Sequence, residues 1–408
     1  MNIKITPSRL KGTVNAPSSK SYSHRMLIAA ALADGVSHIS NITASNDIKA
    51  TCSAMESLGA EISSCGSDYT VKGIGTPALN ADIDCGESGS TLRFLIPIAA
   101  ALGTRAVFNG HANLPNRPVT AYIRELGKKG IRFDRELGLP PTIEGKLEAG
   151  EYLMEGDVSS QYITGLMFAL PLCSEDSIIK LTSPLQSKPY ADMTVAVLSQ
   201  FGVRIVESSM DGLPIYLVKG NQRYKPCDGS VEGDYSQAAF FFTANALGSY
   251  IKINNLNPDT VQGDRAIVDI VNGCTNEMKP FSVDVSDIPD LVPILAVLGS
   301  FTKGKSRLYN AARLKIKECD RLAVTAETLN ALGGRVTVGD DYLETEPIDS
   351  FKGGTVDSHK DHRIVMAAAI AATRSDNPVT ITNAQDVGKS YPKFFEDYAS
   401  LGGIFTEV

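Results

Sequence analysis

The chain repeats a characteristic order of polar and apolar positions. A short polar or small-residue turn precedes an almost uninterrupted apolar run, as in SSKSYSHR before MLIAAAL and DHR before IVMAAAIAA. Six such junctions occur along the chain, at His24, Thr91, Gln161, Gln237, Asp290 and Arg363. A helix that is apolar all around must be buried all around. The pattern therefore predicts six helices enclosed in the core.

A second pattern lies between these runs. A helix ending in Leu-Gly or a similar pair is followed by two strand-like stretches, as in SLGAEISSCGSDYTVKG and ELGKKGIRFDRELGLPPTIEG. Gly just past a helix end is the usual left-handed cap, and the alternating apolar residues after it predict a hairpin. The two patterns combine into a β-α-β-α-β-β unit repeated six times. The stretch NGCTNEMKPFSVDV is a degraded copy of the second pattern.

Pro226–Gly229 is a natural boundary between the third and fourth units. Three units on each side, each contributing one buried helix, predict two α/β domains of similar size. The 408 residues are enough for each domain to bury its own core.

Composition narrows the function classes. With 43% hydrophobic and 21% charged residues, the chain is typical of a globular protein. It has no apolar run long enough to span a bilayer, and MNIKITPSRLKG lacks the apolar region of a secretion signal. Seven scattered cysteines without a CxxC pair favour a reducing cytoplasm. We therefore expect a cytoplasmic protein that does not bind a membrane.

The formal net charge of −7 argues against general binding of nucleic acid. It is compatible with a small anionic substrate, because a few cations in one place can dominate the local field.

Cations accompany several of the predicted helix starts. Lys20 and Arg25 flank Ser21, and Arg93 follows the sequence Gly89-Ser90-Thr91. Helix N-termini have unpaired N–H groups and a positive dipole, so they bind phosphate and carboxylate readily. Ordinary capping by Ser or Asp is the alternative at any single position. Taken together, these starts predict several anion sites.

Other ligand classes are not supported. The sequence Pro17-Ser18-Ser19-Lys20-Ser21 lacks the spacing of a nucleotide-binding P-loop. His359 and His362 have no third metal ligand at a convincing spacing. We expect neither a metal nor an organic cofactor.

The segment 315–322 is dense in charge. A solvated helix face is one interpretation of such a run. The other is that Lys317 and Arg321, four residues apart, share a helix face and present cations to an anion, with Glu318 beside them. Asp290, which opens an apolar helix, supplies a second carboxylate if it is not simply a cap. Two carboxylates in different environments are what general acid and base chemistry requires.

Nine short motifs, in order along nearly the whole chain, make it resemble the family of 3-phosphoshikimate 1-carboxyvinyltransferase, also called EPSP synthase. The motifs are P-S-S-K-S-x-S-H-R at 17–25, G-x-S-G-S-T-L-R at 86–93, N-R-P at 116–118, S-S-Q at 159–161, S-K-P-Y at 187–190, I-P-D at 288–290, K-E-x-D-R-L at 317–322, D-H-R at 361–363 and K-S-Y-P at 389–392.

The resemblance implies a two-domain inverse α/β barrel with the active site in the interdomain cleft. It implies one domain over 15–228 and a second made of 1–14 and 229–408. It also implies transfer of the enolpyruvyl group of phosphoenolpyruvate to the 5-hydroxyl of shikimate 3-phosphate by addition and elimination. No cofactor is implied, the protein is expected to be a monomer, and glyphosate is expected in the phosphoenolpyruvate pocket.

The same resemblance implies roles for individual residues. Asp290 is the expected base, Glu318 the expected acid, and Lys20 a further catalytic residue. Shikimate 3-phosphate is expected against Lys20, Ser21, Arg25, Ser159, Ser160, Gln161, Ser187, Tyr190, Asp290 and Lys317. Phosphoenolpyruvate is expected against Lys20, Gly89, Arg117, Gln161, Arg321, Arg363 and Lys389.

Three positions depart from the family pattern. Cys319 replaces the usual Ser or Thr, the loop at 110–118 that contains His111 lacks an acidic residue, and Arg313 falls near a position where some members have Asn. The sister transferases that act on UDP-N-acetylglucosamine are a rival interpretation, but their loop carries a reactive Cys and 110–118 has none. A non-catalytic scaffold of the same repeats is a second rival, although it would not need so many cations and carboxylates in these motifs.

Overall fold

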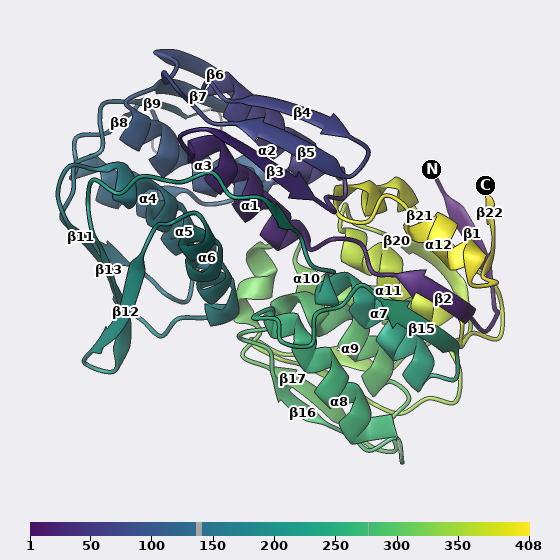
Figure 1. Cartoon of the computed structure of the whole chain (residues 1–408). Coiled ribbons are helices and arrows are strands. Elements are labelled where there is room, and N and C mark those ends of the chain that lie inside the picture. The colour runs from purple at the N-terminus through teal and green to yellow at the C-terminus, as the bar shows by residue number, and fades with distance from the viewer. Residues whose placement is uncertain (136–140, 276) are drawn as a thin grey trace. The chain divides into compact units, whose positions relative to one another are not determined.

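The computed structural model describes residues 1–135, 141–275 and 277–408, which form two compact units (Figure 1). One unit is Ser18–Val231, and the other combines Met1–Pro17 with Glu232–Val408. The chain therefore passes from one unit to the other twice. The residues 136–140 that connect one predicted hairpin lie outside the described residues.

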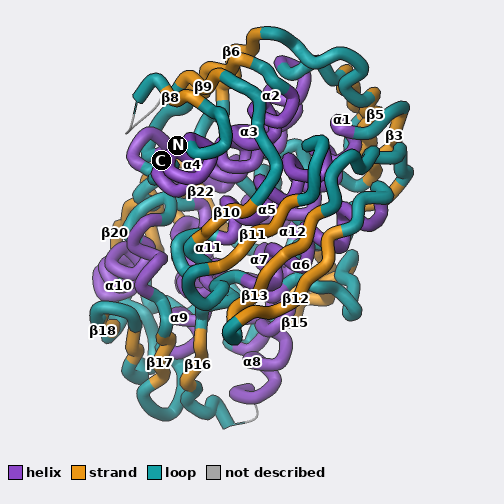
Figure 2. Tube along the Cα trace, turned by 90° about the vertical axis from the view of Figure 1, so that its left-hand side faces the viewer, coloured by secondary structure: helices purple, strands orange, loops and turns teal. Residues whose placement is uncertain are grey.

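Three four-stranded sheets of one design build the unit Ser18–Val231, ordered β14-β3-β5-β4, β6-β7-β9-β8 and β10-β11-β13-β12. In each sheet the first two strands are parallel and the last two form an antiparallel hairpin. Figure 2 shows the third sheet with its four strands side by side. The strands are β3 (Val36–Ser40), β4 (Glu61–Cys65), β5 (Asp68–Lys72), β6 (Asn80–Asp84), β7 (Arg105–Asn109), β8 (Arg132–Phe133), β9 (Thr142–Glu144), β10 (Glu151–Met154), β11 (Ser177–Leu181), β12 (Ile205–Met210), β13 (Leu213–Val218) and β14 (Gly229–Ser230).

The predicted apolar helices of this unit are present and enclosed. They are α1 (Lys20–Leu32), α3 (Gly89–Leu102) and α5 (Ser160–Ala169), and all residues of α3 except Ser90 and Leu102 are buried. Each fully buried Leu, Ile or Phe contributes about 1.5–3 kcal/mol to folding, which explains why these runs stay in the interior. The other helical segments are α2 (Asn46–Ser57), η1 (Leu114–Asn116), α4 (Thr120–Gly127), η2 (Leu170–Leu172) and α6 (Lys188–Gln200).

The second unit contains two four-stranded sheets and a two-stranded one, ordered β16-β17-β19-β18, β20-β21-β1-β22 and β15-β2. The N-terminal strand β1 lies between β21 and β22 and completes the last repeat. Figure 1 shows the two chain ends on the neighbouring strands β1 and β22. The strands are β1 (Ile3–Thr6), β2 (Lys11–Asn15), β15 (Tyr250–Asn254), β16 (Ser282–Asp284), β17 (Ser306–Tyr309), β18 (Val336–Val338), β19 (Leu343–Thr345), β20 (Gly354–Asp357), β21 (Val379–Thr382) and β22 (Ile404–Glu407).

The fourth repeat is the reduced one. Its strand β15 pairs only with β2, and among the described residues the degraded stretch after α8 forms no hairpin of its own before β16. This agrees with the loss of alternating apolar positions in NGCTNEMKPFSVDV. The predicted repeat is otherwise confirmed, and so is the two-unit α/β fold.

The core helices of the second unit are α7 (Tyr235–Ala246), α9 (Val292–Gly299) and α11 (His362–Ala372). Every residue of α9 and α11 is buried, as their apolar sequences predict. No helix in the described parts of the chain is long and apolar enough to cross a membrane. The remaining helical segments are η3 (Gly263–Arg265), α8 (Ala266–Thr275), η4 (Pro289–Leu291), η5 (Ala312–Ile316), α10 (Arg321–Ala331), η6 (Ala384–Lys389) and α12 (Phe394–Ser400).

Candidate active site

The N-terminal ends of the core helices meet within the unit Ser18–Val231. His24 on α1 and Thr91 on α3 both hydrogen-bond to Thr51 of α2, each at 2.7 Å. The side-chain amide of Gln161 on α5 donates to Ser90 of α3 at 3.0 Å. Three positive helix ends are thereby held close to one another.

Serine caps are also present at these ends, as the alternative interpretation proposed. The hydroxyls of Ser19, Ser88 and Ser159 accept from the first-turn amides of α1, α3 and α5. Capping and anion binding are compatible, because one cap satisfies only one of the four unpaired N–H groups of a helix start. What distinguishes these ends is the cations beside them.

Arg25 is a buried cation with neutral partners. Its side chain donates to the hydroxyl of Thr194 at 2.8 Å and to the backbone carbonyls of Ser21 and Tyr190 at 2.8 and 3.0 Å. No carboxylate in the described part of the chain forms an ion pair with it, and burial lowers the pKa of Arg25 to about 10. An uncompensated buried charge is costly. An anionic ligand beside Arg25 would therefore be strongly stabilised.

Arg117 lies against the start of α3. An ideal Cβ on Gly89 would come within 2.5 Å of an Nη atom of Arg117. Gly89 does not have a positive φ angle, so a tight left-handed turn is not the reason for a glycine at this position. The missing side chain instead allows a guanidinium to approach the helix end.

Arg93 holds the side chain of Gln161 in place. Arg93 on α3 donates to the Gln161 side-chain oxygen at 2.7 Å and to the Pro118 carbonyl at 3.2 Å. Burial lowers the pKa of Arg93. Gln161 is thus held between Arg93 and Ser90 with a defined amide orientation.

All ten predicted site residues of this unit lie at the N-cap of a helix, in its first two turns, or just after η1. Lys20 forms an ion pair with Asp47 at 2.8 Å, and Ser187 precedes α6 with a φ of 57°. The ten are Lys20, Ser21, Arg25, Gly89, Arg117, Ser159, Ser160, Gln161, Ser187 and Tyr190.

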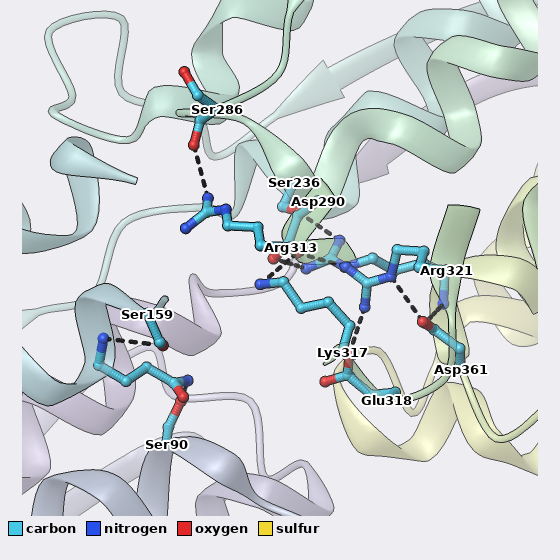
Figure 3. Close-up of polar contacts among 12 residues, drawn as sticks. Ser90, Ser159, Ser236, Ser286, Asp290, Arg313, Lys317, Glu318, Arg321 and Asp361 are labelled. Atoms are coloured by element: carbon cyan, nitrogen blue, oxygen red, sulfur yellow. Dashed lines mark hydrogen bonds and ion pairs between the residues drawn. The ribbon is translucent and has the colours of Figure 1, made fainter. Parts of the chain in front are cut away.

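In the second unit, Arg321 is the centre of a separate cluster (Figure 3). Its guanidinium donates to the carboxylates of Asp290 at 2.8 Å, Glu318 at 2.6 Å and Asp361 at 2.8 Å. The Arg321 side chain is only 1% exposed. Burial by itself would lower the pKa of Arg321, but the three carboxylates raise it well above its usual value. This arginine is therefore a permanent buried cation, not part of a solvated helix face.

Asp290 bridges two arginines. Its second oxygen accepts from Arg363 at 2.6 Å, while Arg363 also donates to the Ser236 hydroxyl at 2.6 Å. Burial would raise the pKa of Asp290, but Arg363, Lys317 and Arg321 together hold it well below its usual value. Asp290 is therefore ionised and tightly paired with these arginines.

The expectation that Lys317 and Arg321 share one helix face is wrong. Lys317 follows the 3-10 segment η5 with extended backbone angles, and α10 begins only at Arg321, where Asp320 caps the helix. Both cations still reach Asp290, at 4.0 and 2.8 Å. Burial lowers the pKa of Lys317 to about 7, Asp290 opposes this shift, and Arg313 and Arg321 add to it.

The positions that depart from the family pattern have modest contacts. Cys319 lies 3.8 Å from the Asp361 carboxylate, and burial raises the pKa of its thiol. His111 lies 3.9 Å from Glu87 near the surface. Arg313 donates to the Ser286 carbonyl at 2.7 Å. Among the described residues there is no group of three His, Cys, Asp or Glu that could hold a metal ion.

Sequence reasoning missed several polar residues of both clusters. Asp361 belongs to the D-H-R motif, from which only Arg363 was predicted to be a site residue. Ser236 lies at a repeat junction where the sequence has no feature that indicates a site residue. Burial raises the pKa of Asp264, in η3, to about 7; Asp290 adds to this shift and Arg363 opposes it. No periodicity identifies Asp264, because its position depends on tertiary packing. Lys389, which the motifs did identify, is buried at the end of η6.

Comparisons with known proteins identify the family of the chain. The family model described as EPSP synthase (3-phosphoshikimate 1-carboxyvinyltransferase) matches residues 5–398. Proteins named 3-phosphoshikimate 1-carboxyvinyltransferase from Clostridium beijerinckii and Clostridium novyi are 43% and 44% identical over 431 aligned positions, covering 100% of this chain and 98% of each relative.

Solved structures show the same fold. The EPSP synthase from Acinetobacter baumannii has a TM-score of 0.81 at 24% identity, with 100% of both chains covered. The enolpyruvyl transferase NikO from Streptomyces tendae has a TM-score of 0.77 at 16% identity, covering 99% of this chain and 98% of that one. On the family match and the identity of its relatives, the chain belongs to the EPSP synthase family.

Proposed function

We propose that this protein transfers the enolpyruvyl group of phosphoenolpyruvate to the 5-hydroxyl of shikimate 3-phosphate and releases phosphate. One observation carries the proposal within the structure: Asp290 and Glu318, a pair suited to proton transfer, are bound by the same buried arginine, Arg321. The arrangement places two carboxylates and a fixed cation together, as an addition–elimination at an anionic enol phosphate requires.

The cluster in Ser18–Val231 is proposed to hold shikimate 3-phosphate. Arg25, with only neutral partners, suits the phosphate, and the hydroxyls and amides at the starts of α1, α5 and α6 suit phosphate and carboxylate oxygens. Asp290 and Lys317 of the second unit are proposed for the ring hydroxyls. The first-unit contacts are assigned to Lys20, Ser21, Arg25, Ser159, Ser160, Gln161, Ser187 and Tyr190.

Phosphoenolpyruvate carries a phosphate and a carboxylate, so it needs several cations. Arg117 beside Gly89 and the arginine pair Arg321 and Arg363 provide planar guanidinium groups suited to bidentate pairing. The full set assigned to this substrate is Lys20, Gly89, Arg117, Gln161, Arg321, Arg363 and Lys389.

The proton transfers follow from the two carboxylates. Asp290 takes the proton of the 5-hydroxyl while the hydroxyl oxygen bonds to the central carbon of phosphoenolpyruvate, and Glu318, in its protonated form, gives a proton to the methylene carbon. The tetrahedral adduct then loses phosphate, which leaves with the proton held by Asp290, and a proton of the new methyl group returns to Glu318 as the double bond re-forms. Paired with two arginines, Asp290 is a weak base, and it becomes more basic when those arginines turn toward a bound anion.

No metal or organic cofactor takes part in this scheme. We further propose that the protein acts as a monomer in the cytoplasm. All seven cysteines, which lie in the described ranges, are free thiols, and this supports a reducing compartment.

A thermal-shift experiment tests the assignment of the shikimate 3-phosphate site. A ligand that binds only the folded protein stabilises it by about 2.7 kcal/mol at one hundred times its Kd. Shikimate 3-phosphate is expected to raise the Tm of the wild type and to have little effect on Arg25→Ala. Lys219→Ala, at an exposed surface lysine, is the control and should respond like the wild type. An equal shift for Arg25→Ala would contradict the assignment.

A further inference from the structure

The three carboxylates on Arg321 differ in how firmly they are held. Asp361 is fully buried, and its two oxygens have different tasks: one accepts from Arg321 at 2.8 Å and the other accepts from the backbone amide of Arg363 at 3.0 Å, capping α11. The side chains of Asp290 and Glu318 are 18% and 12% exposed. Asp361 therefore holds Arg321 and caps a core helix at the same time.

From this difference we infer that Asp361 is a positioning residue, the permanent anchor of Arg321, whereas Asp290 and Glu318 are exchangeable partners that a bound anion displaces. Binding of phosphoenolpyruvate then does two things at once. Its carboxylate takes the place of the two exchangeable carboxylates on Arg321, and the two displaced groups become available for proton transfer. The inference rests on the proposed binding of phosphoenolpyruvate by Arg321.

Charge and geometry both support the exchange. Each of the three guanidinium nitrogens of Arg321 donates to a carboxylate, at 2.6–2.8 Å. These contacts use three of the five N–H donors of the guanidinium, so a carboxylate that pairs with two adjacent donors competes with these groups and forms charge-assisted hydrogen bonds of the same kind. Asp361 cannot leave without uncapping α11, so the displaced groups are Asp290 and Glu318.

Asp361 also fixes the positions of the two arginines proposed for phosphoenolpyruvate relative to each other. Asp361 holds the side chain of Arg321 and, through its cap, fixes the first turn of the helix that carries Arg363. A carboxylate that acts in both ways sets the relative position of two guanidinium groups within one unit. Because Arg321 is proposed to pair with the anion both before and during the reaction, a shift of Arg321 should appear mainly as a loss of affinity for phosphoenolpyruvate.

The inference predicts opposite effects for two removals of negative charge. Asp361→Asn keeps a good N-cap residue but weakens the hold on Arg321, so affinity for phosphoenolpyruvate should fall about 10-fold or more. Glu318→Gln removes a competitor for Arg321, so affinity should rise a few-fold although turnover is slow. A residue with a purely structural role would not produce this difference in sign.

The measurement is the phosphoenolpyruvate concentration at half-maximal rate in single turnovers, with the enzyme saturated with shikimate 3-phosphate. Asp320→Asn is the matched control, because Asp320 caps the neighbouring helix α10 from an exposed position one residue before Arg321. It should leave the half-saturation concentration unchanged. The Tm of each variant reports whether the cap is retained, and Asp361→Ala, which removes it, should lower the Tm further than Asp361→Asn.

Three outcomes separate the hypotheses. Weaker binding in Asp361→Asn together with tighter binding in Glu318→Gln supports the inference. Changes of the same sign in both variants, or no change in Asp361→Asn, overturn it. Arg321→Lys tests the proposed function separately: if that variant binds phosphoenolpyruvate as tightly as the wild type, the assignment of Arg321 is wrong, and the inference fails with it.

Discussion

Replacement of Gly89 by Ala tests the phosphoenolpyruvate site through a single methyl group. The added Cβ would lie 2.5 Å from an Nη atom of Arg117 and 2.9 Å from its Cζ, whereas ordinary contacts begin near 3.4 Å. The guanidinium must therefore move by about 1 Å, which a flexible arginine side chain can do without disturbing the backbone. Because Gly89 has no positive φ angle, the Ala variant should fold.

The size of the effect follows from that displacement. A hydrogen bond to a charged group is worth about 1.5–3 kcal/mol, and about 1.4 kcal/mol corresponds to a factor of ten. If Arg117 pairs with phosphoenolpyruvate, Gly89→Ala should lower kcat/KM for this substrate by about 10- to 100-fold. Most of the loss should appear in KM, because Arg117 contacts the substrate before and during the reaction.

Steady-state kinetics at saturating shikimate 3-phosphate measure this effect, with two controls. Gly273→Ala adds a methyl group in open space on α8 and should leave the kinetics unchanged. In an Arg117→Ala background, Gly89→Ala should have little further effect, because the residue through which it acts is gone. A full loss in that background, or a normal KM in the single variant, would refute the reasoning.

Three further predictions follow from the same clusters. Asp290→Asn and Glu318→Gln should each lower kcat by about 100- to 10,000-fold in a phosphate-release assay. The affinity for shikimate 3-phosphate, measured by calorimetry, should change much less. Near-normal turnover would assign the two carboxylates to ion pairing alone. Because the pKa of Lys317 is lowered to about 7, this side chain loses its proton as the pH rises above 7, so affinity for the shikimate 3-phosphate anion should weaken between pH 7 and 9. Binding at pH 8 should take up a proton, as calorimetry in two buffers of different ionisation enthalpy can detect, and Lys317→Arg should abolish the uptake. Glyphosate is longer than phosphoenolpyruvate, so Gly89→Ala should increase the inhibition constant of glyphosate by a larger factor than the KM of phosphoenolpyruvate. Equal increases in the two constants would contradict a shared pocket.

The hydrophobic pattern predicted the core well, because burial of an all-apolar helix leaves little choice of environment. The six apolar runs became α1, α3, α5, α7, α9 and α11, and the stretch without alternating apolar residues is the repeat that lacks its own hairpin. The pairing of β1 with β21 and β22 could not be read from periodicity. Strand partners far apart in sequence depend on the whole fold.

The candidate site was predictable in its residue types but not in its pairing. The motifs contained Asp290, Glu318 and Arg321, yet nothing in their spacing showed that one arginine binds both carboxylates. Helical periodicity was misleading at Lys317, because the cap at Asp320 delays the start of α10. Asp361 and Ser236 entered the cluster only through side-chain contacts between distant elements.

The most direct test of the account is phosphate release from phosphoenolpyruvate with alternative acceptors. The purified protein is expected to release phosphate when shikimate 3-phosphate is present, with one enolpyruvyl ether formed for each phosphate, and to release none with UDP-N-acetylglucosamine. Release with UDP-N-acetylglucosamine, or no release with shikimate 3-phosphate, would contradict the proposed function.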